Sequence, residues 1–127
     1  MSKPEILHTG FKIDEPKLWA VDLPIENILI SEIEYNLDIP YLEKEGTDDW
    51  NLTPRVLIET FDKEPHHAKV VAQADITYPI ELYLHKGKWI ILDGVHRFTK
   101  AVLLGHKTIN VRRISEKLAQ TVKRQID

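Results

Sequence analysis

The hydrophobic and polar positions of the chain give their clearest signal after residue 78. Residues 80–84 alternate between aliphatic side chains and Glu or Tyr, which is the two-residue period of a half-buried strand. A turn sequence follows at 85–88, and residues 89–92 form an almost wholly apolar run. Such a run is typical of a central strand buried on both faces. The two runs predict a β-hairpin.

Helix signals flank this hairpin. The Thr-Pro pair at 53–54 places an N-cap hydroxyl before a proline at the first helical position, and a second short helix is predicted over 65–73. A further helix is predicted over 95–104, with Gly105 at its C-cap position.

A strand over 108–112 and a last helix, from Glu116 to about Gln125, complete the pattern. Ser115 is the predicted N-cap of that helix.

The N-terminal half gives weaker signals. Residues 1–17 are predicted to be an irregular arm, and 18–23 read as a first strand that Pro24 ends. Residues 25–35 fit neither period, so strand and helix both stay open there. Residues 36–52 read as an acidic loop.

The predicted architecture is therefore one α+β domain, residues 1–127, with a small mixed sheet and about four helices.

Composition and charge exclude several classes of protein. The 127 residues contain no cysteine, which excludes disulfides, thiolate metal sites and cysteine nucleophiles. The N-terminus lacks a signal-peptide pattern, and a cytoplasmic protein with no membrane partner is expected. The net charge of −3 hides an asymmetry, because residues 1–64 carry −9 and residues 65–127 carry +6. The basic half could receive an anionic ligand, or the acidic half could balance it internally.

The segment most typical of a functional site is 93–97, with the sequence DGVHR, between an apolar strand and a helix. Unpaired N–H groups at a helix start attract anions, and a glycine lets the backbone approach them closely. His96 and Arg97 would add two donors that can carry positive charge in the first turn, where an anion would offset them. The alternative interpretation makes Asp93 an N-cap, Gly94 a turn residue and Arg97 a surface ion-pair partner.

These residues, with the strands before and after them, resemble the ParB/sulfiredoxin superfamily over residues 78–114. Sulfiredoxins carry a cysteine where Val95 stands, so sulfinic-acid repair is excluded. ParB-type CTP-binding domains carry glutamate and arginine at 95 and 96. The most similar motif is that of the free serine kinase branch, Asp-Gly-His-His-Arg, which residues 93, 94, 96 and 97 match.

The resemblance implies roles for individual residues. Gly94, His96 and Arg97 would bind phosphate or nucleotide, and Mg²⁺ with ATP, ADP or CTP would be the cofactors. In the kinase alternative Glu32 and Asp93 would be catalytic.

The function expected first is the binding of a nucleotide or another phosphorylated small molecule. Phosphoryl transfer to a small hydroxyl compound is an alternative from another class. The acidic net charge argues against a third, a module that binds nucleic acid. The adjacent His66 and His67 diverge on a helix or a strand and could not easily bind one metal ion together. Both are expected to be solvated. The sequence leaves the oligomeric state open.

Overall fold

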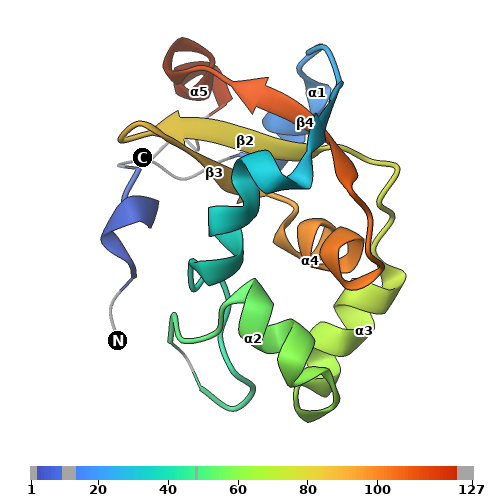
Figure 1. Ribbon diagram of the computed structural model, residues 1–127. Coiled ribbons are helices and arrows are strands. Elements are labelled where there is room, and N and C mark those ends of the chain that lie inside the picture. The colour runs from blue at the N-terminus through green and yellow to red at the C-terminus, as the bar shows by residue number, and fades with distance from the viewer. Residues whose placement is uncertain (1–2, 10–13, 48, 123–127) are drawn as a thin grey trace.

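One mixed four-stranded sheet organises the computed structural model, which describes residues 3–9, 14–47 and 49–122 (Figure 1). The strands follow the order β1-β4-β2-β3; β2 and β4 are parallel and the other two pairs are antiparallel. Their bounds are Glu26–Leu29 for β1, Ile80–His85 for β2, Lys88–Asp93 for β3 and Thr108–Ile114 for β4. The predicted α+β class, mixed sheet and hairpin are confirmed.

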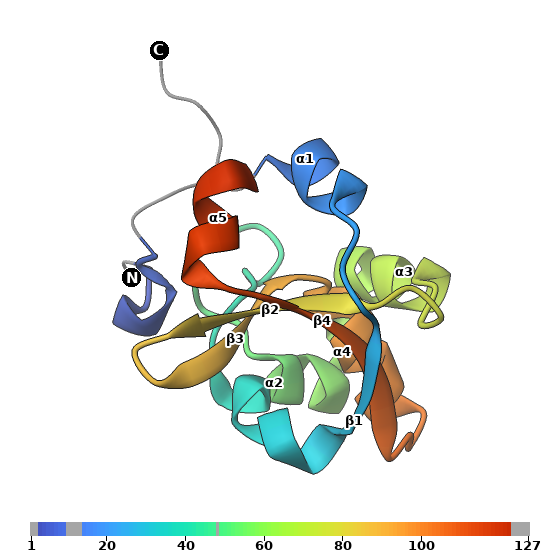
Figure 2. The ribbon, with the colours of Figure 1, turned by 90° about the horizontal axis from the view of Figure 1, so that it is seen from above.

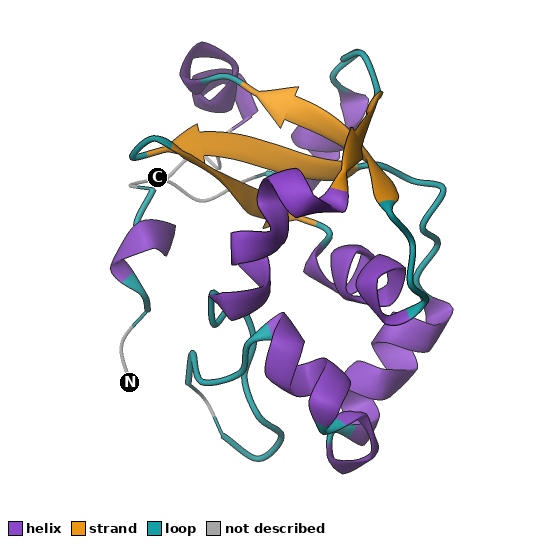
Figure 3. Ribbon diagram, in the orientation of Figure 1, coloured by secondary structure: helices purple, strands orange, loops and turns teal. Residues whose placement is uncertain are grey.

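Among the described residues, five α-helices and three 3₁₀ segments surround this sheet (Figure 3), slightly more than predicted. The α-helices are α1 (Glu15–Ala20), α2 (Pro54–Glu59), α3 (Pro65–Gln73), α4 (Val95–Leu103) and α5 (Glu116–Val122); the 3₁₀ segments are η1 (Glu5–Leu7), η2 (Ile30–Asp38) and η3 (Phe61–Lys63).

The predicted caps are in place at three helices. The Thr53 hydroxyl accepts from Val56 N, and the Ser115 hydroxyl accepts from Leu118 N. After α4, Gly105 follows the C-cap at a φ of 78°, and a pair of backbone bonds to Val102 O and Ala101 O closes the helix end. The predicted end of the last helix, 123–125, lies outside the described residues.

Both faces of the sheet are buried, by different helices. In Figure 1, α2, α3 and α4 lie below the sheet, and α1 and α5 lie above it. Figure 2 shows α1 and α5 close together, away from α2. The side chains of adjacent strand residues alternate between the two cores. One core contains Leu82, Ile91 and Phe98, and the other contains Leu18, Tyr83, Ile90 and Ile114.

The prediction of a strand at 18–23 is wrong, because α1 covers its first residues. The helix starts where an Asp14 carboxylate oxygen accepts from Lys17 N and Pro16 stands within the first turn. Leu18, fully buried, is the residue that fixes this short helix to the core. The irregular arm predicted for 1–17 is likewise interrupted by η1 and by the start of α1; residues 1–2 and 10–13 lie outside the described residues.

The prediction that residues 89–92 form a central strand is also wrong, because β3 is an edge strand. Side chains from η2 and the following loop cover its open edge. The Tyr35 hydroxyl accepts from Trp89 N and donates to Trp89 O, Asn36 Nδ2 also donates to Trp89 O, and the Tyr41 hydroxyl accepts from Ile91 N. The edge therefore has partners for its backbone, and apolar residues are tolerated there.

The ambiguous segment 25–35 contains both kinds of structure: β1 comes first and η2 follows at once. Within 36–52, the first three residues belong to η2. Residues 39–47 and 49–52 are loop, joined by one bridge between Leu42 and Leu52, and residue 48 lies outside the described residues.

Candidate functional site

The site is built where β3 ends and α4 begins. Gly94 is the N-cap residue, with a φ of 102° and a ψ of 24°. A Cβ at this position would lie 2.7 Å from Ile80 Cγ2, so both the backbone angle and the space require glycine. The N–H groups of residues 95–97 have no acceptor within the helix, and they give this end of α4 a partial positive charge.

Asp93 does not cap α4. Its Oδ2 accepts from Arg97 Nη2 at 3.1 Å and from Trp19 Nε1 at 3.0 Å. The ion pair spans one helical turn and is partly buried, with 21% of the Arg97 side chain and 25% of the Asp93 side chain exposed. Asp93 thus holds the guanidinium at the start of α4 and ties α1 to the same place.

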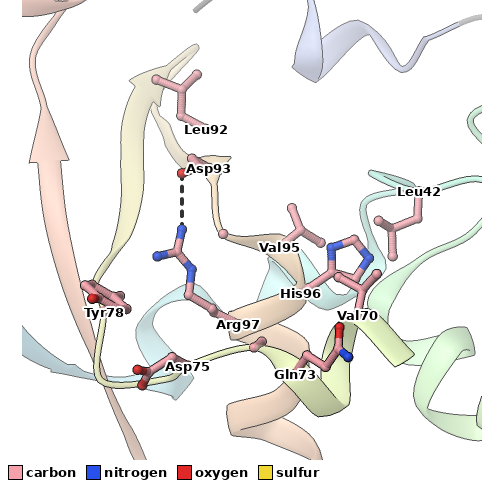
Figure 4. A pocket seen from close by; sticks show the side chains of 12 residues that line it. Leu42, Val70, Gln73, Asp75, Tyr78, Leu92, Asp93, Val95, His96 and Arg97 are labelled. Carbon is pink, nitrogen blue, oxygen red and sulfur yellow. Dashed lines mark hydrogen bonds and ion pairs between the residues drawn. The ribbon is translucent and has the colours of Figure 1, made fainter. Parts of the chain in front are cut away.

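A pocket of about 590 Å³ opens over this turn (Figure 4). Residues 92–97 form one wall, and the end of α3 and the segment after it form another; Leu42 reaches in from the loop. Asp75 and Tyr78 lie near Arg97 in Figure 4, across from the turn. The pocket therefore combines helix N–H donors and one guanidinium with the carboxylates of Asp75 and Asp93.

His96 lies in the same wall and is neutral at pH 7. Burial, followed by repulsion from His67 and His66, lowers the pKa of His96 to about 4. Its Nε2 lies 3.0 Å from Nδ1 of His67, and His67 Nε2 lies 2.6 Å from the carbonyl oxygen of Glu43. The positive charge that the motif brings to the pocket therefore comes from the Arg97 side chain.

A second buried pair lies behind the site in the sheet. In the register of the sheet, Glu81 on β2 lies opposite Asp93 on β3 and opposite Arg112 on β4. Glu81 is 2% exposed, and among residues 3–9, 14–47 and 49–122 neither its Oε2 nor Nε of Arg112 has a hydrogen-bond partner. Burial raises the pKa of Glu81 to about 7, with Arg112 acting against the rise and Asp93 adding to it. Arg112 Nη2 donates to Leu18 O, so this pair also touches α1.

The structure brings four of the five predicted site residues together, namely Asp93, Gly94, His96 and Arg97. Glu32 is not among the residues that line this pocket. It is exposed in η2, where its Oε2 accepts from Leu29 N and closes the start of that segment. The acidic loop contributes Leu42, whereas Trp50 lines a neighbouring pocket of about 310 Å³ together with His67.

Sequence reasoning missed His67. The expectation of two solvated histidines holds for His66, which is exposed, but His67 is 7% exposed and bonded on both ring nitrogens. A signal was present, because His67 and Val71 stand four residues apart on the buried face of α3.

No protein-family model matches the chain, and no curated protein and no solved structure matches it either. Within residues 3–9, 14–47 and 49–122, no group of three or more His, Asp or Glu side chains has an arrangement that could hold a metal ion. None of the described helices is long and apolar enough to cross a membrane.

Proposed function

We propose that this protein binds a nucleotide or another phosphorylated small molecule at the start of α4. The observation that carries the proposal is the pocket of about 590 Å³ whose wall includes the whole turn from Leu92 to Arg97. Its volume is in the range of small-molecule sites. The resemblance of residues 93–97 to the ParB/sulfiredoxin superfamily supports the same ligand class.

Arg97 and the first turn of α4 would bind the phosphate oxygens. Only Nη2 of Arg97 is engaged by Asp93, and a guanidinium has five N–H donors in a fixed plane. The ion pair holds the side chain near the helix N–H groups, which reduces the entropy that a ligand must remove.

The carboxylates of Asp75 and Asp93 oppose a bare polyphosphate. A magnesium ion that arrives with ATP, ADP or CTP would offset this repulsion, because Mg²⁺ usually takes one or two protein carboxylates together with phosphate oxygens. Asp93 Oδ2 accepts from Trp19 and Arg97, and Asp75 Oδ1 accepts from the N and Oγ1 of Thr77. Asp93 Oδ1 and Asp75 Oδ2 are therefore the oxygens that would bind such an ion.

Calorimetric titration with ATP, ADP and CTP, each with and without Mg²⁺, tests the proposal. Arg97→Ala is expected to weaken binding by about 1.5–3 kcal/mol, the scale of a charged hydrogen bond, and Arg97→Lys by less. Arg55→Ala is the matched control, because it breaks an exposed ion pair with Asp38 and does not line the pocket. Equal affinities for the Arg97→Ala variant and the wild type would refute the assigned site.

A further inference from the structure

The hydrogen-bonding character of the pocket is fixed by a chain of three groups. The carbonyl oxygen of Glu43 only accepts, so His67 Nε2, at 2.6 Å, must carry a proton and donate it. When both imidazoles are neutral, His67 Nδ1 is then an acceptor. It accepts from His96 Nε2, at 3.0 Å, and this leaves His96 Nδ1 without a proton.

The packing around His67 holds this chain in place. His67 is 7% exposed in α3, and its ring meets that of His96 edge to edge, with centroids 5.2 Å apart and planes 24° apart, as a bond between two ring nitrogens requires. The Glu43 segment is fixed to the start of α3 by two further bonds: Glu45 N donates to Glu64 Oε2, and His66 N donates to Glu45 Oε1.

His96 Nδ1 is available to a ligand. It has no hydrogen-bond partner within the described residues. The fully buried side-chain polar atoms that lack a partner there are Glu81 Oε2, His85 Nε2 and Arg112 Nε, so His96 Nδ1 is not fully buried. His96 and Arg97 both line the pocket, with the imidazole toward Leu42 and Val70 and the guanidinium toward Asp93 and Tyr78 (Figure 4). The same pocket thus offers a lone pair and a cation.

We infer that His67 is a positioning residue that holds His96 Nδ1 as an acceptor, so that the site selects an oxyanion that carries an O–H group. The ligand class is hydrogen phosphate, or a phosphorylated compound with a hydroxyl close to its phosphate. This inference rests on the proposed function and adds a selection rule to it.

Sulfate is the ligand that this arrangement rejects. Sulfate has the size and charge of hydrogen phosphate but carries no proton at neutral pH, so its oxygens would meet the His96 lone pair without a hydrogen between them. Asp75 and Asp93 add acceptors to the same pocket. The lost hydrogen bond and the repulsion together predict that phosphate binds at least about tenfold more tightly than sulfate.

Two measurements on the unmodified protein test the inference. Calorimetry compares inorganic phosphate with inorganic sulfate at pH 7 and equal ionic strength. Nitrogen-15 NMR of histidine-labelled protein reports whether each ring nitrogen carries a proton, and His96→Gln identifies the His96 signals. The expected results are a preference for phosphate of at least about tenfold and an unprotonated His96 Nδ1.

Variants of His67 test its positioning role. His67→Phe keeps a ring but removes both nitrogens, and it should reduce the phosphate preference at least threefold. His67→Asn restores an acceptor near His96 Nε2 and should recover part of the preference. His66→Phe, at the exposed neighbouring position, should leave it unchanged.

The outcomes separate the inference from the proposed function. Equal binding of sulfate and phosphate, or a protonated His96 Nδ1, would overturn the inference while the anion site stands. Failure of phosphate, sulfate and all three nucleotides to bind would overturn the proposed function, and the selection rule with it.

Discussion

Trp19 Nε1 donates a hydrogen bond to Asp93 Oδ2 across 3.0 Å, and the same oxygen accepts from Arg97. The indole comes from α1, 74 residues earlier in the chain, and 56% of the Trp19 residue is exposed. An exposed indole adds little by burial. Its contribution is the bond that fixes α1 to the residue at which the candidate site begins.

Trp19→Phe should therefore destabilise the protein by about 0.5–1.5 kcal/mol, the net value of one hydrogen bond. Urea unfolding measures the loss. A double-mutant cycle with Asp93→Ala should give a coupling energy of at least about 0.5 kcal/mol, since the two residues are in contact. Strictly additive losses would show that the bond contributes nothing.

Gly94 and Gly105 form a matched pair at the two ends of α4. Both have positive φ, but a Cβ at Gly94 would meet Ile80 at 2.7 Å, whereas a Cβ at Gly105 would meet nothing within 4 Å. Gly105→Ala should cost about 1 kcal/mol from backbone strain alone. Gly94→Ala should cost about 1–3 kcal/mol more, because the core must also shift. Urea unfolding of both variants checks the difference, and equal losses would contradict the close packing at Gly94.

Glu81 should make stability depend on pH. Its folded pKa is raised to about 7 from 4.5, so the folded state binds the proton more tightly than the unfolded state. The resulting stability is complete below about pH 4.5 and is lost as the pH rises through about 7. Relative to Glu81→Gln, the wild type should lose up to about 3 kcal/mol between pH 4.5 and 8.

Denaturant unfolding of both proteins across this pH range is the measurement. Glu34→Gln, at an exposed position, is the control and should track the wild type. A constant difference between the wild type and Glu81→Gln at all pH values would contradict the raised pKa.

Local signals in the sequence were sufficient for the second half of the fold. The hairpin, α3 and the turn at 93–97 follow from periods and caps that lie within a few residues of one another. The same kind of signal is present at α1, where Asp14 is the N-cap and Pro16 lies in the first turn. These two residues precede the apolar run at 18–23, and that run by itself predicts a strand.

The errors concern contacts between distant segments. The order of the strands decides whether residues 89–92 form a central strand. The apolar run predicts a neighbouring strand on each side, but on one side the side chains of residues 35–41 take that place. His67 meets His96 only because α3 packs on α4. The spacing of His67 and Val71 marks the buried face of α3, but the contact with His96 and the order of the strands leave no mark in the local sequence. The motif could therefore be found from the sequence, whereas its contact with His67 could not.

The most direct test of the phosphate site is a ¹H–¹⁵N NMR titration with Mg²⁺–ATP, repeated with inorganic phosphate. The proposal predicts saturable shifts at the backbone amides of residues 93–98 and at the facing segment 73–75. A separate pocket, of about 210 Å³ and lined by Asn27 and Thr108 among others, should show none. Saturable shifts confined to other surfaces, or no shift at 93–98 with any of these ligands, would contradict a phosphate site at the start of α4.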